Sequence, residues 1–515
     1  MSPLDLSIVV ASLIGLVVLA GWLARRQRHT ADFYLGGGRL PAWALGLSLA
    51  ANQVSAISLI GAPAFVALRP GGGLGWLQYE LAVPLAMAAL VMWGVPFLRR
   101  AAGAEVYEVV EARLGPAARR LLAAFFLVGR GLGAGVVLYA SSLVVDACTA
   151  WGFSTSLLVV GSVAVAYTAL GGLTADVISD VLQFGLLWGA TVVVTVVLGL
   201  RMAGRGLLTG VDPARLVILD LNHHGLGDGA TFAFWPMLIG GFFLYVSYYG
   251  CDQTQAQRIL AAADADQARR ALTVASLVRF PLVLTYCLFG LMLAAFLAAT
   301  PDFAQSLAGR PPDALVPQFL VTYLPTGIVG VVVAGILAAA LSSIDSALNS
   351  LSAVVVEEFS TAALRRDPAR QLRWARLATV GWGVAATTAA WFFSRAGETS
   401  IELINRVGSA LYGPVLAVFL LAWRSRRADG WSAVAGAVTS LLANLALAAW
   451  APGISWLWWN VVGCVVTLVI GVAFGRSKAA AEPVGDHEGR GYATILVVFF
   501  VVIIVLLAWT TIWLR

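Results

Sequence analysis

The sequence has little charge and few of the groups that catalysis or metal binding needs. Of its 515 residues only 12% are Asp, Glu, Lys or Arg, whereas 60% are hydrophobic, and soluble domains carry about 25% charged residues. This composition excludes a water-soluble fold. The four cysteines lie far apart without a CxxC pair, which argues against a zinc site, an iron–sulfur cluster or a disulfide framework.

Long apolar runs are what the sequence has in abundance. They follow one another along almost the whole chain, and about 20 apolar residues in a helix cross the hydrocarbon layer of a bilayer. We count about fourteen such runs, which predicts an all-α integral membrane protein whose surroundings are the lipid bilayer. The first run, Leu4–Leu23, has no basic segment before it and no AxA-like cleavage site, so we interpret it as a retained helix.

Basic residues gather in alternate loops between the runs. One set of loops holds 23 of the 33 Lys and Arg residues, and Lys and Arg are mostly kept on the cytoplasmic side of a membrane. With fourteen spans, this asymmetry predicts a multi-pass protein of the inner or plasma membrane with both termini extracytoplasmic. Despite a net charge of +6, the short clusters do not form the continuous basic face that nucleic acid requires, so no nucleic-acid partner is expected.

Charges inside the apolar runs are the strongest indication of function. A charged side chain at the bilayer centre costs about 2.5–3.5 kcal/mol on insertion scales and persists where it faces a cavity or a partner. Such residues inside the runs or at their edges are Glu80, Arg130, Asp176, Asp180, Arg279, Asp345, Glu402 and Arg406, of which the last two lie near a helix end and are interpreted as interfacial. No histidine lies within a run, and no nucleophile stands beside a base, so we do not expect an enzyme.

Hydroxyl and amide side chains surround Asp345. Ser342, Ser346 and Asn349 recur at helical spacing around it, so one helix face presents the hard oxygen ligands that small cations prefer. The alternative interpretation is a serine-rich contact between helices that is held by hydrogen bonds.

Two runs carry polar or glycine-rich interruptions. Within Leu40–Ala67, the polar side chains of Asn52–Ser58 precede a Gly61–Pro63 break. Broken helices in transporters expose backbone carbonyls to cations near the membrane midplane. Five helices later, the run Thr231–Gly250 contains glycines, tyrosines and a serine from Gly240 onward, which predicts a second interruption there.

Six separated segments together resemble the sodium:solute symporter family, whose members include sodium/glucose, sialic acid and proline carriers. In chain order they are DFYLGGGRLPAW, SLAANQVSAISLIGAPA, YTALGGLTADVISDVLQFG, DQTQAQRILAA, SSIDSALNSLS and GSALYGPVLAVF. The resemblance implies the leucine-transporter-like fold, an inverted repeat of five plus five helices with flanking helices. It divides the chain into an N-terminal helix and cytoplasmic loop (1–39), a first repeat (40–205), an extracellular loop (206–230), a second repeat (231–427) and additional C-terminal helices (428–515).

The resemblance also implies one or two sodium ions as the coupling cofactor. It places a first sodium site at the carbonyls of Ala56, Leu59 and Ala339 and the hydroxyls of Ser342 and Ser343. A second site, for sodium or a proton, would involve Asp180, Asp345 and Ser346. Asp345 departs from the family pattern, in which a hydroxyl is expected at that position.

For the solute, the resemblance implies a site formed by Ser58, Gln78, Glu80, Arg130, Tyr245 and Tyr248. Arg130 favours a carboxylate, whereas Gln78 and Glu80 suit a polyhydroxylated sugar. The alternative for Arg130 is a pair with Glu80 or Asp146 that only braces helices.

We therefore expect a secondary active transporter that couples the sodium gradient to uptake of a small polar organic solute by alternating access. The solute would be a sugar or a carboxylate-bearing compound, such as sialic acid or another organic acid. A proton-coupled carrier and a transporter-like sensor or channel are the alternatives.

Overall fold

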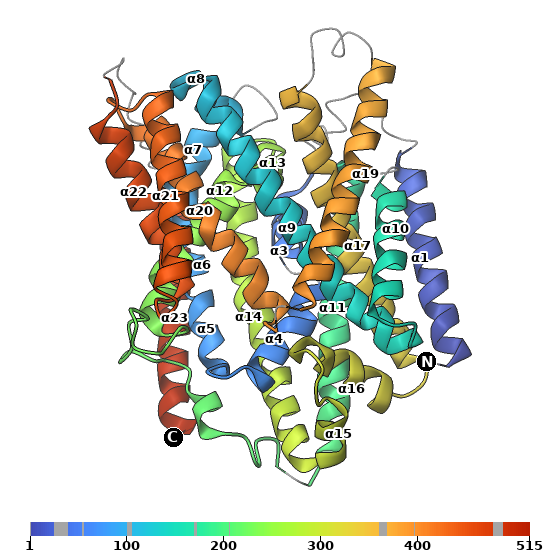
Figure 1. The fold of residues 1–515 in the computed structure, drawn as a ribbon. Coiled ribbons are helices and arrows are strands. Elements are labelled where there is room, and N and C mark those ends of the chain that lie inside the picture. Colours follow the sequence, from blue (N-terminus) through green and yellow to red (C-terminus); the bar gives the residue numbers. More distant parts are fainter. Residues whose placement is uncertain are drawn as a thin grey trace.

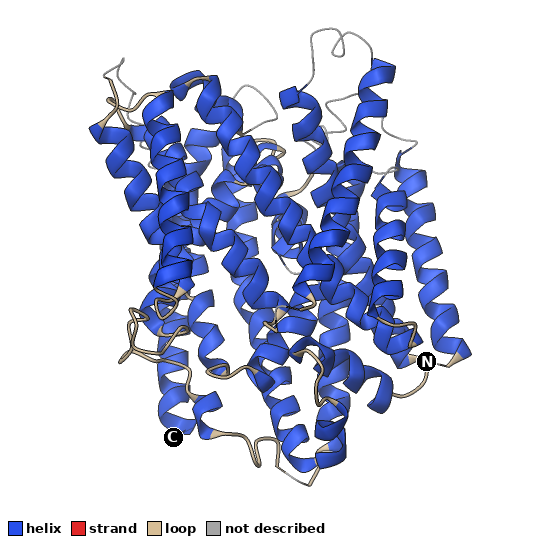
Figure 2. Cartoon of the chain, in the orientation of Figure 1, coloured by secondary structure: helices blue, strands red, loops and turns tan. Residues whose placement is uncertain are grey.

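The computed structural model describes residues 2–24, 40–53, 56–99, 106–168, 173–204, 206–359, 368–395, 397–476 and 488–514. Within these ranges the regular elements are helical, apart from one isolated bridge between Leu226 and Ile454. The predicted all-α class is therefore confirmed for the described chain, as Figure 2 shows.

The helices follow the apolar runs closely. The first part of the chain forms α1 (Pro3–Ala24), α3 (Ala42–Gln53), α4 (Ala56–Leu68), η2 (Leu74–Trp76), α5 (Leu77–Glu80), α6 (Ala82–Ala89), η3 (Leu90–Gly94), α7 (Val95–Leu98), α8 (Tyr107–Leu114), α9 (Pro116–Thr149), α10 (Phe153–Thr168) and α11 (Leu173–Arg201). The middle forms η4 (Pro213–Leu216), η5 (Pro236–Gly240), α12 (Gly241–Cys251), α13 (Gln253–Leu260), α14 (Ala265–Ala299), α15 (Pro301–Ser306), η6 (Pro312–Ala314) and α16 (Leu315–Tyr323). The last part forms α17 (Ile328–Phe359), α19 (Pro368–Phe393), α20 (Ser400–Arg424), α21 (Gly430–Trp450), η7 (Trp456–Trp458), α22 (Trp459–Ala473) and α23 (Arg490–Leu514).

Nine of the described helices are long and apolar enough to cross a membrane, and a bent pair raises the number to ten. They differ in depth within the bundle. In α17, 83% of the apolar window is buried inside the protein, whereas in α23 the share is 22%. Because lipid solvates apolar side chains as well as a protein core does, α23 is suited to the lipid-facing rim and α17 to the centre of the bundle.

The bent pair is the first predicted interruption. Helices α3 and α4 meet at 52° across a short break, and the break contains Ser55, which lies outside the described residues. Both helices pack against α14. In Figure 1 they lie in the middle of the bundle, between α1 and α10 on one side and α21 and α22 on the other.

The second predicted interruption is wrong in its position. The chain stays helical from Pro236 through Cys251, beginning with one π-helical segment, and the helix ends at Asp252. The glycines serve close packing instead. A Cβ atom on Gly240 would lie 2.3 Å from the carbonyl oxygen of Leu457, and one on Gly241 would lie 2.8 Å from the ring of Tyr79.

Candidate functional site

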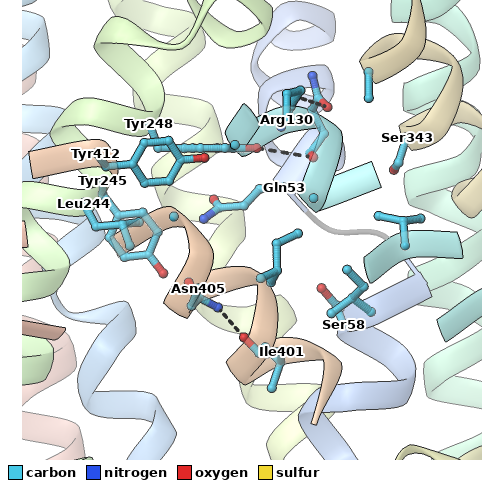
Figure 3. A pocket seen from close by; sticks show the side chains of 18 of the residues that line it. Gln53, Ser58, Arg130, Leu244, Tyr245, Tyr248, Ser343, Ile401, Asn405 and Tyr412 are labelled. Atoms are coloured by element: carbon cyan, nitrogen blue, oxygen red, sulfur yellow. Dashed lines mark hydrogen bonds between the residues drawn. The ribbon is translucent and has the colours of Figure 1, made fainter. Parts of the chain in front are cut away.

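A cavity of about 110 Å³ lies where α3 and α4 meet the surrounding helices. Its polar lining comes from Asn52, Gln53, Ser58, Tyr79, Arg130, Tyr245, Tyr248, Arg279, Ser343, Asn405 and Tyr412. Four of the predicted solute residues are in this lining: Ser58, Arg130, Tyr245 and Tyr248. In the view of Figure 3, Ser58 and Ser343 lie on one side of the cavity and Tyr245 and Tyr248 on the other.

Arg130 reaches this cavity from α9 without a carboxylate partner among the described residues. Its Nη2 atom lies 3.4 Å from the side-chain amide of Asn52 (Figure 3). Its Nε atom is buried without a hydrogen-bond partner in the described chain. The predicted alternative, a bracing pair with Glu80 or Asp146, is therefore wrong. Glu80 forms its ion pair with Arg279.

Glu80 and Arg279 form a two-point ion pair between α5 and α14. The Nε atom of Arg279 donates to Oε2 of Glu80 at 2.8 Å, and its Nη2 atom donates to Oε1 at 3.1 Å. Arg279 lines the cavity, but Glu80 does not. The pair thus brings no net charge to the cavity, and the predicted direct contact of Glu80 with the solute is not supported by this geometry.

Gln78 is fully buried, and other contacts occupy its amide group. Its Nε2 atom donates to the carbonyls of Gly75 at 3.1 Å and Phe232 at 3.2 Å, while its Oε1 atom accepts from the backbone N–H of Asp220 at 2.8 Å. Gln78 is absent from the lining of the cavity. The geometry does not support the predicted solute contact, because the side chain anchors the connection around residue 220.

A smaller cavity of about 30 Å³ adjoins the first. Arg130, Tyr412, Gly129 and Gly408 line both cavities, and Asp252 lines only the smaller one. The rings of Tyr248 and Tyr412 pack edge to face with centroids 5.9 Å apart. The hydroxyl of Tyr248 donates to the carbonyl of Asn52 at 3.4 Å, so this tyrosine ties α12 to the end of α3.

The residues of the predicted first sodium site lie on two helices that pack together, α4 and α17. Ala56 begins α4, and Leu59 is buried one turn later. On α17, the hydroxyl of Ser343 donates to the carbonyl of Ala339 at 3.0 Å and also lines the large cavity.

The two carboxylates of the predicted second site lie on different helices, α11 and α17, and Ser346 is buried on α17 next to Asp345. Asp180 accepts hydrogen bonds from Ser342 at 2.9 Å and Ser48 at 2.6 Å, and it forms an ion pair of 2.7 Å with Arg258. Asp345 instead accepts from Nδ2 of Asn349, one turn further along α17, at 3.2 Å.

Sequence reasoning missed Arg258, Arg279 and Asp252 as members of these sites. Arg279 had a visible signal, because it is a charge inside an apolar run. Arg258 and Asp252 lie in the polar segment that follows α12, where a charged residue is unremarkable in sequence. Only the fold shows that both are buried.

A family model described as the sodium:solute symporter family matches residues 33–442. The chain belongs to the sodium:solute symporter family. It is therefore a sodium-coupled solute symporter and not an enzyme, and sodium is the ion that travels with the solute.

Two curated relatives match most of this symporter. The human sodium/iodide cotransporter is 29% identical over 458 residues, which are 86% of this chain and 68% of the relative. The sodium/sialic acid symporter SiaT of Proteus mirabilis (strain HI4320) is 25% identical over 478 residues, which are 91% of this chain and 94% of that protein.

A solved structure of a Na⁺-coupled sialic acid symporter in a substrate-bound, outward-open state has a similar fold. The TM-score is 0.77 at 22% sequence identity, and the match covers 93% of this symporter and 100% of that chain. The helical bundle and the placement of its elements thus agree with an established transporter architecture.

Proposed function

We propose that this symporter imports a small organic monocarboxylate together with sodium. The observation that carries the proposal is Arg130, a partly buried guanidinium in the cavity wall that forms no ion pair with a described residue and whose Nε atom is buried without a hydrogen-bond partner among them. A partly buried charge without an ion pair is costly, so a carboxylate that enters the cavity gains both an ion pair and charge-assisted hydrogen bonds.

The charge balance of the cavity favours a solute with one negative charge. Arg279 is paired with Glu80, whereas Arg130 forms no ion pair among the lining residues described and has only the electrostatic attraction of Asp252 in the adjoining smaller cavity. The names of the two relatives, which denote carriers of iodide and sialic acid, are consistent with recognition of a single negative charge.

The dimensions of the cavity favour a small solute. Its volume is about 110 Å³, and a protein cavity of about 150 Å³ holds benzene. The amides of Gln53 and Asn405 and the hydroxyl of Ser58 offer hydrogen bonds to a hydroxyl or keto group beside the carboxylate. The case for a sugar weakens, because Gln78 and Glu80 do not line the cavity.

The proposed coupling site is the predicted first sodium site of Ala56, Leu59, Ala339, Ser342 and Ser343. Ser343 lines the same cavity as Arg130, which supports a cation bound beside the solute. The bend between α3 and α4 lies at this point, so ion and solute would stabilise the same arrangement of the broken helix before alternating access.

We also propose that four further helices complete about fourteen spans: α1, α10, α12 with η5, and α19. The apolar segments Pro3–Ser12 and Phe153–Ala166 support this count. The five-plus-five inverted repeat would then comprise 40–205 and 231–427. Both chain ends lie in the lower half of the view in Figure 1, which is consistent with termini on one side of the membrane, proposed to be extracytoplasmic.

Uptake into proteoliposomes tests the proposal. Purified protein would receive an inward sodium gradient and radiolabelled lactate, pyruvate, sialic acid, iodide or glucose in turn. We expect carboxylate uptake that disappears when choline replaces sodium and that excess glucose does not inhibit. Uptake that follows an imposed proton gradient without sodium would contradict the coupling, and preferential uptake of iodide or glucose would contradict the solute class.

A further inference from the structure

Asp313 is a buried carboxylate that takes no part in the proposed sodium and solute sites. It lies in η6 between α15 and α16, and its side chain is fully buried. Its Oδ2 atom accepts from the backbone N–H of Ser400 at 2.7 Å, whereas its Oδ1 atom has no hydrogen-bond partner in the described chain. No ion pair among the described residues includes Asp313. In such surroundings a carboxyl group favours its protonated form, because burial penalises the charge.

The helix that Asp313 binds forms part of the wall of the large cavity. α20 begins at Ser400, and Ile401, one residue later, lines the cavity. α4 is in close contact with this end of α20, because a Cβ atom on Gly61 would lie 2.5 Å from the hydroxyl oxygen of Ser400. We call this contact between Gly61 and Ser400 the α4–α20 seam. Ser58 of α4 and Ile401 both lie in the lower part of the view in Figure 3, so the seam borders the cavity at that end. Because η6 also packs against α4, three segments meet at the seam.

The seam lies on the side of the bundle that we propose to be extracytoplasmic. In Figure 1, α15 and α16, which flank η6 in the chain, lie in the lower half of the view, as do both chain ends. A solute that enters the cavity between α4 and α20 requires these helices to separate. Their separation would also admit water to Asp313, since this residue is bonded to the end of α20 at the seam.

The ionisable groups around Asp313 do not neutralise it. On α20, Glu402 adds a further negative charge, and Arg69 pairs with Glu402 at 2.8 Å. On α9 the neighbouring ionisable side chain is Tyr139. α4 carries no ionisable side chain, and α16 carries one at its last residue, Tyr323. Burial, followed by the charge of Glu402, therefore raises the pKa of Asp313 from an ordinary 3.8 to about 7.

We propose that Asp313 is a proton-binding site that keeps the α4–α20 seam closed, so that external acid opposes opening of the cavity on this side. The neutral carboxyl is stable in the buried seam, whereas the carboxylate favours an arrangement that water reaches. The closed form thus binds the proton more tightly than the open form, and pH shifts the equilibrium between them. The inference rests on alternating access in the proposed function, but not on the identity of the solute.

The expected size of the effect follows from the two protonation equilibria. In the closed form the pKa of Asp313 is about 7, and in an open, hydrated seam it should return toward the ordinary 3.8. Between pH 6 and pH 8 the closed form loses its bound proton while the open form is already ionised. The ratio of closed to open protein should therefore fall by up to about tenfold over this interval.

Access of a reagent to the cavity tests the inference without a transported solute. Ser58→Cys places a thiol in the cavity lining, and sulfonatoethyl methanethiosulfonate, which does not cross membranes, is added outside intact cells. Ser306→Cys, at an exposed position on α15, is the matched reporter, and the ratio of the two labelling rates corrects for the ionisation of an accessible thiol. Labelling of the chain without an added cysteine is subtracted. From pH 6 to pH 8 this ratio should rise about 5- to 10-fold.

Neutral replacements of Asp313 decide whether this carboxyl causes the rise. Asp313→Asn should abolish it, because the amide stays neutral while its oxygen still accepts from Ser400. Asp302→Asn removes an exposed carboxylate from α15 and should leave the rise intact. If Asp313→Asn does not fold, Asp313→Ser provides a smaller neutral side chain.

Two results would overturn the inference: a labelling ratio that does not change with pH in the natural chain, or the same rise in a neutral variant of Asp313. Failure of the proposed function would look different. Proteoliposomes would then take up no lactate with sodium, whereas the labelling ratio would still rise with pH and depend on Asp313.

Discussion

Two arginines in unlike surroundings line the large cavity. We call the part of the lining at Arg279 the paired wall and the part at Arg130 the single-arginine wall. On the paired wall, Arg279 is matched by Glu80 through two hydrogen bonds. On the single-arginine wall, Arg130 lies near Tyr248 and Tyr412 and has no ion pair among the residues described. The contrast teaches that one arginine belongs to the architecture, whereas the other is available to a ligand.

The physical reason lies in the cost of burying charge. A buried ion pair holds helices in register, and removing one partner is far more damaging than replacing both. A buried charge without a partner favours ligand binding instead, because a ligand of opposite charge offsets the free-energy cost of its desolvation. The two walls should therefore respond differently to the same neutralising substitution.

The largest expected effect is on the paired wall. In Glu80→Gln, Arg279 keeps its charge in a buried position without a counter-ion, which should lower the stability of the folded protein by about 3–5 kcal/mol. The measurement is the melting temperature of the purified protein in detergent. Asp146→Asn, at a partly buried position on α9, is the matched control and should melt close to the natural chain. An unchanged melting temperature in Glu80→Gln would remove the distinction between the walls.

The next effect is on the single-arginine wall. Arg130→Gln should reduce carboxylate uptake, measured as kcat/KM, by about 10- to 100-fold, which corresponds to the loss of hydrogen bonds to a charged group of roughly 1.5–3 kcal/mol. Folding should not suffer, because no ion pair is broken. Arg130→Lys should retain part of the activity, since an ammonium keeps the charge but loses the two-point geometry. A melting temperature that falls as far as that of Glu80→Gln would instead make Arg130 a structural residue.

The sequence alone could predict which helices carry charge, but not how those charges pair. Composition and run length sufficed for the membrane class. Four of the residues predicted from the motifs, Ser58, Arg130, Tyr245 and Tyr248, line one cavity. Pairing depends on the rotation of each helix about its axis, and Glu80 and Arg279 are separated by 199 residues. A local pattern contains no information about such a contact. Gln78 was predicted to bind the solute because it is polar and lies in an apolar run. Its amide group instead forms hydrogen bonds with backbone groups of Gly75, Phe232 and Asp220.

The glycines around Gly240 show a second limit of sequence reasoning. Glycine both weakens helices and permits close helix contacts, and a sequence pattern does not distinguish the two uses. At Gly240 and Gly241 the contact partners are Leu457 and Tyr79, which come from distant segments. The break therefore falls at Asp252, after the helix, rather than within it.

A smaller effect should separate anchoring from solute binding. Gln78→Ala leaves the carbonyl of Phe232 and the N–H of Asp220 without their partner, so stability should fall by about 1–3 kcal/mol. The KM for the solute should stay unchanged, because Gln78 does not line the cavity. Gln53→Ala is the matched comparison: Gln53 lines the cavity, so its removal should raise KM. A raised KM in Gln78→Ala would restore the role that the sequence suggested.

The smallest expected effect concerns Asp313, which binds the N-terminus of the helix that carries Tyr412. Tyr412 lies on α20, and the N-terminus of α20 is held by Asp313, whose Oδ2 atom accepts from the backbone N–H of Ser400 at 2.7 Å. The Oδ1 atom is buried without a partner in the described chain. Burial raises the pKa of Asp313 from an ordinary 3.8 to about 7.

Because the pKa of Asp313 is raised on folding, the protonated carboxyl favours the folded state, and its contribution is lost as pH rises from 3.8 through about 7. Between pH 6 and pH 8 the loss should be about 1.4 kcal/mol, visible as a lower melting temperature at pH 8. Asp313→Asn should flatten this slope, because the amide stays neutral while its oxygen still accepts from Ser400. Both the natural chain and Asp313→Asn should carry His223→Gln in this comparison. Asp220 raises the pKa of the exposed His223, so its titration would otherwise add to the pH dependence of the melting temperature. If the melting temperature falls equally between pH 6 and pH 8 in the natural chain and in Asp313→Asn, protonation of Asp313 does not stabilise the N-terminus of α20. The pH dependence of stability would then come from another group.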